Sequence, residues 1–179
     1  MKKIILAALT AILAWGNTAF ARDPEPVNRA FTWGADVGGS VDMEGHDMST
    51  LDIDAYFGYR GPWLQIAGIG VGINMPVDNS YRTFPIYGIV RTSFAKGPRP
   101  VFADVRVGCV INETPDGETS CNLYCSPGIG FRLAYGKTYA SYLIVGYMYN
   151  GMRGKGYIDD RNKEIKGLSA AVIRLGLRF

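Results

Sequence analysis

Histidine and cysteine are scarce in this sequence. Among 179 residues there is one histidine, His46, and there are three cysteines, Cys109, Cys121 and Cys125. Because thiolates and imidazoles are the usual ligands of zinc and other transition metals, this supply is too small for a clustered site. We therefore expect no metal centre and no cofactor.

A strong charge of one sign is also missing. Nineteen Lys and Arg residues face sixteen Asp and Glu residues, for a formal net charge of +3, and the basic residues do not form a block. Nucleic-acid-binding proteins usually carry such a basic block, because they must contact phosphates. We therefore expect no nucleic-acid partner.

Long apolar segments are absent beyond the N-terminus. Lys2 and Lys3 precede a run of about a dozen mostly apolar residues at 4–15, and 19–21 read Ala-Phe-Ala. This order is typical of a cleaved secretory signal, and the run is shorter than the roughly 20 residues of a transmembrane helix. We expect residues 1–21 to be a signal peptide, 22–30 a short periplasmic lead with two prolines, and 31–179 a single domain.

What the chain has in quantity is alternation of apolar and polar residues. Near the C-terminus, apolar side chains fall at every second position up to Phe179, while Arg174, Gly176 and Arg178 occupy the positions between them. A period of two predicts a β-strand. Glycine is abundant, with 23 residues. The mean hydropathy is only +0.03 although 47% of the residues are hydrophobic, and strands with one apolar and one polar face would give such an average.

Eight segments have this strand character. They are 31–43, 50–60, 63–74, 82–94, 101–111, 121–135, 138–149 and 167–179. The connections after the second, fourth and sixth segments are short, and most of the others are longer and more polar. An even strand number with this alternation is typical of bacterial membrane barrels, and it predicts that both termini lie on the periplasmic side.

The last strand carries a more specific pattern. Its terminal aromatic residue and the alternate apolar residues before it resemble the C-terminal assembly signal of bacterial outer-membrane β-barrels: Ile173, Leu175, Leu177 and Phe179. In architecture the chain resembles the small transmembrane barrels of the OmpA and OmpX type. The resemblance implies an all-β, eight-stranded antiparallel up-and-down transmembrane β-barrel in the outer membrane, with a structural or surface-interaction role and no enzyme activity. It also implies contact with outer-membrane lipid, lipopolysaccharide and the barrel-assembly machinery, and leaves the extracellular partner unidentified.

Charged residues occur mainly on the face predicted to point inward. Five acids and six arginines share this face: Asp36, Asp42, Asp52, Asp54, Asp104, Arg60, Arg91, Arg106, Arg132, Arg174 and Arg178. Since the lumen of an eight-stranded barrel is only wide enough for side chains, these charges must pair. We predict an ion-paired lumen without an open pore. The alternative is that they are solvated charges on the outside of a soluble sheet.

The sequence also allows two other functional interpretations. His46 and Ser49 lie in the first outer loop, and lipid A palmitoyltransferases and deacylases, which resemble this architecture, use a histidine and a serine. The alternative function is thus an outer-membrane lipid A-modifying enzyme, although an ordinary exposed loop explains both residues. A soluble periplasmic lipocalin-like binder of small ligands is the third interpretation, and it requires apolar side chains to point inward.

The cysteines allow one structural prediction. A turn near Asp116 and Gly117 would bring Cys109 opposite Cys125 on the outward face, leaving Cys121 over. A disulfide between Cys109 and Cys125 can form in an oxidising compartment. Three unpaired thiols are the alternative.

Overall fold

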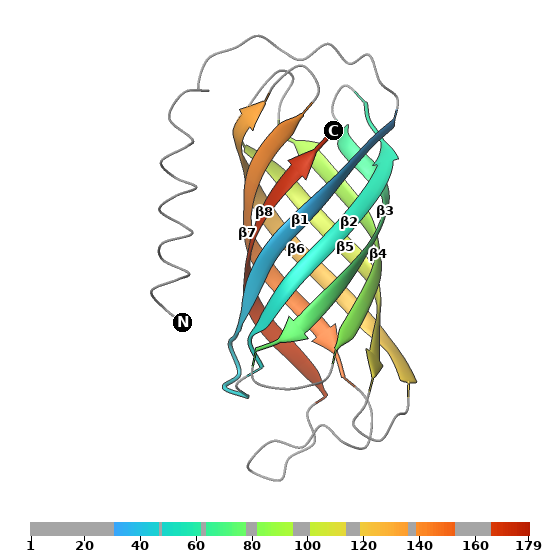
Figure 1. Ribbon diagram of the computed structural model, residues 1–179, viewed down its shortest axis with the longest axis vertical. Helices are drawn as coiled ribbons and strands as arrows, with labels where there is room; N and C mark the ends of the chain where they lie inside the picture. Colours follow the sequence, from blue (N-terminus) through green and yellow to red (C-terminus); the bar gives the residue numbers. More distant parts are fainter. Residues whose placement is uncertain are drawn as a thin grey trace.

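The computed structural model describes residues 31–46, 48–61, 64–77, 82–94, 101–113, 119–135, 139–152 and 166–179. They form eight antiparallel strands in one closed barrel (Figure 1). The strands are β1 (Phe31–Asp42), β2 (Thr50–Tyr59), β3 (Leu64–Pro76), β4 (Thr83–Ser93), β5 (Val101–Glu113), β6 (Thr119–Tyr135), β7 (Ala140–Gly151) and β8 (Gly167–Arg178). Within these ranges, no helix is long and apolar enough to cross a membrane. The predicted all-β, eight-stranded antiparallel up-and-down barrel is confirmed, and each strand end lies within two residues of its predicted position.

The first and last strands close the barrel. β8 pairs with β1 from Gly34 opposite Arg178 to Asp42 opposite Ala170. Figure 1 shows the start of β1 and the C-terminus at the same end of the barrel. We call this the terminal end, and the opposite end, where β1 turns into β2, the loop end. Closure matters because it leaves no strand edge with unpaired backbone groups.

The predicted alternation of connection lengths is only partly correct. We expected a loop over 112–120, but β5 continues to Glu113 and β6 begins at Thr119. The resulting connection, 114–118 at the loop end, is shorter than 94–100 at the terminal end. The expected signal peptide (1–21), the lead (22–30) and most of the loop at 150–166 lie outside the described residues.

The two faces of the barrel wall have opposite chemistry. β2 alternates strictly, with Thr50, Asp52, Asp54 and Tyr56 buried and the residues between them exposed. Large apolar side chains across the outer face are 40–60% exposed, for example Phe57, Ile69, Val71, Val107 and Ile129. The buried charged groups therefore lie in the interior, together with aromatic and aliphatic side chains such as Tyr56, Phe102 and Ile144, and apolar groups cover the outside. This polarity is the reverse of what the lipocalin-like alternative requires.

Glycine on the inner face makes room for aromatic rings in the narrow lumen. A Cβ atom built at Gly130 would collide with the ring of Phe102, and one built at Gly176 would collide with the ring of Tyr142. Each ring thus packs directly on the backbone of the glycine, where a larger side chain would not fit. Gly34 and Gly70 make room in the same way for the rings of Tyr56 and Tyr87.

Candidate functional site

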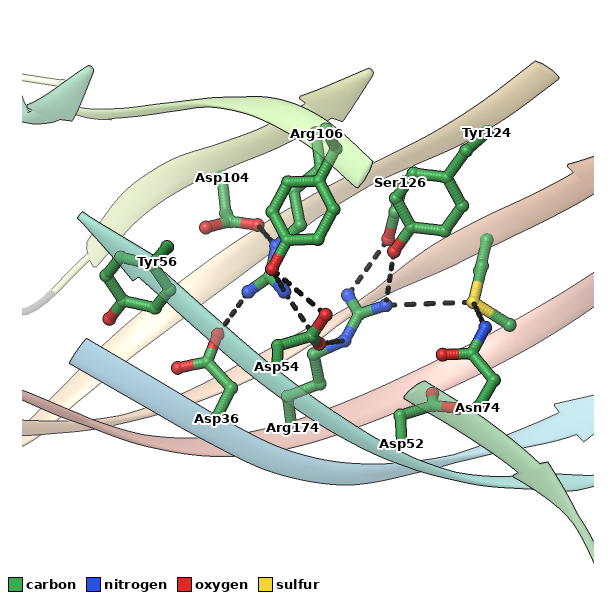
Figure 2. Close-up of polar contacts among 12 residues, drawn as sticks. Asp36, Asp52, Asp54, Tyr56, Asn74, Asp104, Arg106, Tyr124, Ser126 and Arg174 are labelled. Carbon is green, nitrogen blue, oxygen red and sulfur yellow. Dashed lines mark hydrogen bonds and ion pairs between the residues drawn. The ribbon is translucent and has the colours of Figure 1, made fainter. Parts of the chain in front are cut away.

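Three aspartates and three arginines meet in the middle of the lumen. Figure 2 shows the aspartates with Arg106 and Arg174. Asp36 on β1, Asp54 on β2 and Asp104 on β5 face Arg91 on β4, Arg106 on β5 and Arg174 on β8. All six side chains are at most 2% exposed. We call these six residues the central cluster. Its formal charges cancel, which buried ions require.

Arg106 contacts all three carboxylates of the central cluster. Its Nε donates to Asp104 Oδ1 at 3.0 Å, its Nη1 donates to Asp54 Oδ2 at 2.9 Å, and its Nη2 donates to Asp36 Oδ2. Asp36 and Asp54 are direct partners in the β1–β2 register. Like charges in that position repel each other, so the guanidinium between them is what makes their pairing tolerable.

The other two arginines complete the central cluster. Arg91 donates through Nε to Asp104 Oδ2 at 2.8 Å, and its Nη2 lies 2.7 Å from the same oxygen. Arg174 approaches Asp54 Oδ2 at 3.4 Å and donates through Nη1 to Ser126 Oγ at 2.9 Å. The planar guanidinium suits such multiple bonding because its donors point in fixed directions.

Tyrosines on the inner face satisfy the remaining oxygens and cover the guanidinium planes. Tyr142 donates to Asp36 Oδ1 at 2.5 Å, and Tyr87 donates to Asp54 Oδ1 at 2.9 Å. The Arg91 guanidinium lies 4.2 Å from the Tyr142 ring centre, a favourable cation–π distance. The sequence prediction of the cluster omitted these tyrosines, although they fall at the same alternate positions as the charged residues.

The other charged residues that we predicted for the lumen have different positions. Asp52 is fully buried nearer the loop end, where its Oδ1 accepts a hydrogen bond from Thr50 at 2.5 Å. Arg178 is buried at the terminal end and donates to the Gln65 carbonyl at 3.4 Å. Arg60 and Arg132 are only half-buried.

Asp42 is the last residue of β1, and its side chain bonds to the first loop rather than to the charges of the lumen. Its carboxylate accepts hydrogen bonds from the backbone N–H groups of Glu44 and His46, the former at 2.8 Å. Gly45 between them has a φ of 79°, a left-handed conformation that favours glycine. Because Asp42 stands at the end of β1, it stabilises a tight turn instead of pairing with an arginine.

His46 and Ser49 also take part in the structure of this loop. His46 Nε2 lies 3.3 Å from Glu44 Oε2, and the Ser49 carbonyl accepts a hydrogen bond from the Val77 N–H at 2.9 Å. These contacts are typical of a folded loop. They do not define a nucleophile and its general base.

The cysteine pairing differs from the prediction. Cys109 on β5 forms its disulfide with Cys121 on β6, with the two Cα atoms 5.9 Å apart, and Cys125 is free. The predicted partner Cys125 is wrong, since the structure joins Cys109 to Cys121. Cys109 lies opposite Leu123 in the β5–β6 register, with Cys121 and Cys125 two residues to either side of Leu123. The sequence prediction placed the turn near 116–117 but did not fix this register.

The C-terminal strand presents the predicted apolar row on the outside. Ile173, Leu177 and Phe179 are 40–49% exposed, while Leu175 is half-buried. The Phe179 ring stacks on Trp33 with centroids 4.6 Å apart, and the Phe179 N–H donates to the Trp33 carbonyl at 2.8 Å. The last residue of the chain therefore helps to close the barrel.

One further feature of the lumen was missed in the sequence. Met48, Met152 and Leu168 form a small buried apolar cluster at the loop end, two of them from positions just outside the strands. In the described part of the chain, no three His, Cys, Asp or Glu side chains come together as a metal site. The apolar cluster had no sequence signal because its members come from three separate segments.

The fold and the buried cluster together define a class: an eight-stranded closed barrel with an ion-paired interior and an apolar exterior. Neither a family model nor a curated protein matches the sequence. Among solved structures, the chain is similar to Neisserial surface protein A (NspA), with a TM-score of 0.54 and 17% sequence identity. The match covers 84% of this chain and 96% of NspA. At this identity the likeness concerns the fold.

Proposed function

We propose that this protein is a bacterial outer-membrane barrel with a structural or surface-interaction role. The observation that carries the proposal is the apolar outer face. Val105, Val107, Ile129, Val145 and Ile173 are 41–50% exposed in the middle of their strands. In water so large an apolar surface would drive aggregation, whereas in a bilayer it faces lipid.

Aromatic side chains support a membrane position. Phe31, Trp33, Tyr59, Tyr139 and Phe179 are exposed at the terminal end. At the loop end Phe84 and Tyr147 are exposed in the same way. Aromatic residues favour the two interfaces of a bilayer because their rings are partly polar. In this proposal both termini lie in the periplasm and the loop end faces the outside.

The proposed barrel conducts no ions. Arg91, Arg106, Arg174, Tyr124 and Phe102 are among the largest fully buried side chains, and they extend from different strands into the lumen. An eight-stranded barrel has room for little else. We expect no stable conductance steps when the purified protein is added to a planar bilayer; regular steps would contradict a filled lumen.

Outer-membrane lipid, lipopolysaccharide and the barrel-assembly machinery are the proposed partners. The apolar outer face would contact outer-membrane lipid and lipopolysaccharide, and the row from Ile173 to Phe179 would be read by the barrel-assembly machinery during insertion. Recognition of extracellular partners would fall to the loop end. NspA, by its name, is a surface protein, which agrees with a role of this kind.

The first experiment is cell fractionation followed by gel electrophoresis of boiled and unboiled samples. A closed barrel in the outer-membrane fraction should migrate faster unboiled, because it stays folded in the detergent. Recovery of the folded chain from the soluble periplasmic fraction would refute the membrane proposal.

A matched pair of variants tests the lipid-facing surface directly. Val107→Arg places a charge in the middle of β5 and should cost about 2–4 kcal/mol of folding free energy in lipid vesicles. Val41→Arg, near the loop end of β1, should cost only about 0–1 kcal/mol. Equal effects of the two substitutions would argue that neither position faces a bilayer.

A further inference from the structure

The hydrogen-bond ladder between β6 and β7 is interrupted within the barrel wall. The register passes from Cys125 opposite Tyr149 to Gly128 opposite Gly146, and it skips the two positions between them on each strand. On its other side, β6 is paired without a gap along the whole length of β5. The interruption therefore concerns only the edge of β6 that faces β7.

Pro127 causes this interruption, because proline has no backbone N–H group to donate. In the β6–β7 register Pro127 falls opposite Tyr147, whose carbonyl would accept a hydrogen bond from any other residue type at position 127. Proline is normally confined to edge strands and bulges, where no donor is needed. Since this barrel is closed, β6 has a neighbour on each side, and the missing bond lies inside the wall.

The hydroxyl group of Ser126 replaces the missing donor. Ser126 Oγ donates to the Tyr147 carbonyl at 3.1 Å. The same oxygen accepts a hydrogen bond from Arg174 Nη1 at 2.9 Å, and Figure 2 shows the Arg174 side chain pointing from the central cluster toward Ser126. A hydroxyl group can donate one hydrogen bond and accept others. Ser126 therefore links the interrupted ladder to the buried charges.

The residues next to the interruption add little to the contact between the two strands. Gly128 and Gly146 are direct partners, so neither contributes a side chain to a cross-strand pair. A Cβ atom built at Gly146 would collide with the carbonyl oxygen of Pro127. A larger residue at position 146 would therefore not fit beside the proline.

A second interruption, between β3 and β4, is better supported. The register of these strands skips Pro85 in the same way. Both flanking pairs carry side chains, however: Val71 opposite Ile86 and Asn74 opposite Thr83. Cross-strand pairs of side chains stabilise a sheet, so the boundary between β6 and β7 is the weaker of the two.

We propose that the barrel opens locally between β6 and β7, and that the Ser126 hydroxyl is the latch that holds this boundary closed. We call residues 126–128 and 146–148 the β6–β7 seam. Local opening separates fewer bonds at the seam than at an uninterrupted boundary. Loss of the latch would leave the Tyr147 carbonyl without a donor, which is costly away from water. The inference goes beyond the proposed function and does not depend on the membrane location.

Hydrogen exchange of the β7 amides tests the seam, and the strand supplies its own control. Successive residues of an antiparallel strand direct their N–H and C=O groups to opposite neighbours. Because the Tyr147 carbonyl bonds to Ser126, the N–H groups of Tyr147 and Tyr149 face β6. The N–H groups of Gly146 and Met148 then face β8.

Exchange is measured by NMR, residue by residue, on the full chain refolded in detergent. After correction for intrinsic rates, the amides of Tyr147 and Tyr149 should exchange at least about tenfold faster than those of Gly146 and Met148. Equal rates at the two edges of β7 would overturn the proposal.

Two substitutions test the latch. Ser126→Ala removes the hydroxyl group, so exchange at Tyr147 should become about tenfold faster while Met148 keeps its rate. Pro127→Val supplies the missing N–H group, so it should slow exchange at Tyr147. In the double variant Ser126→Ala should then have almost no effect, because the Tyr147 carbonyl has a donor again.

The double variant separates the latch from a role of Ser126 that acts only through Arg174. If Ser126→Ala speeds exchange equally with and without Pro127→Val, Ser126 does not replace the ladder donor and the proposal is wrong. Ser40→Ala is the matched control: it removes another buried hydroxyl, on β1, and should leave the β7 rates unchanged. If Ser126→Ala does not fold, Pro127→Val alone still decides, since unchanged exchange at Tyr147 would overturn the proposal.

Discussion

Replacing Arg106 by leucine is the most direct test of the buried ion pairs. Arg106 donates to Asp36, Asp54 and Asp104, and its side chain is completely buried. Leucine would leave Asp36 and Asp54 facing each other across the β1–β2 register without the cation between them. Asp104 would keep only Arg91.

The expected cost follows from the asymmetry of buried ion pairs. Removing one partner of such a pair typically costs about 3–5 kcal/mol, because the remaining charge stays out of water without compensation. Arg106 has three carboxylate partners, so we expect a loss at the upper end, about 5 kcal/mol of unfolding free energy. Arg106→Lys keeps the charge but loses the fixed directions of the guanidinium, and it should show an intermediate loss.

Urea titration of the refolded protein measures this loss, with the unboiled gel band and tryptophan fluorescence as two independent readouts. Arg82→Leu is the control, because Arg82 is exposed just before β4 and its replacement should change the free energy by at most about 0.5 kcal/mol. A loss below about 1 kcal/mol for Arg106→Leu would refute the reasoning. It would mean that these charges are solvated or that the lumen rearranges around them.

Three more predictions concern the barrel wall. The first uses maleimide labelling of the unreduced, denatured protein to count free thiols. With the disulfide between Cys109 and Cys121, Cys125→Ser should leave no free thiol and Cys121→Ser should leave two. The opposite pattern would support the predicted Cys109–Cys125 pair. Deleting Phe179 removes its ring stack on Trp33 and its backbone bonds at the β1–β8 closure, so urea stability should fall by about 2 kcal/mol, and an unchanged midpoint would contradict this. Gly130→Val should push against Phe102 and cost about 1–3 kcal/mol by the same titration, whereas an equally stable variant would show that the ring can move aside.

Much of the fold could be predicted because barrel strands follow a local rule. Alternation is a property of neighbouring residues, so strands such as β2 and β5 are visible without knowledge of their partners. The same rule placed Asp36, Asp54, Asp104, Arg91 and Arg106 on one face, and the structure brings them together. It failed for Asp42, because a residue with the right parity at a strand end can turn into the loop instead.

Register could not be predicted, because it depends on how two strands align. The Cys109 disulfide illustrates this point. Cys121 and Cys125 both face outward on β6, so parity allows either, and both flank Leu123, the direct partner of Cys109; the structure joins Cys109 to Cys121. The shift in β3 pairing between Leu64 and Ile66 is of the same kind. It buries both Gln65 and Ile66, which strict alternation would place on opposite faces.

The sequence by itself determined the number of strands, the inward face of each strand away from its ends and from the irregularity at Leu64–Ile66, and an interior with nearly equal numbers of acids and arginines. Only the tertiary structure decided which charges meet. Arg106 bonds to Asp54 and Asp36, which precede it by 52 and 70 positions in the chain, and Asn112 on β5 reaches Gly151 on β7, two strands away. The physical reason is that parity is set by each strand's own backbone, whereas contacts through the lumen depend on barrel closure and on the registers of all eight strands.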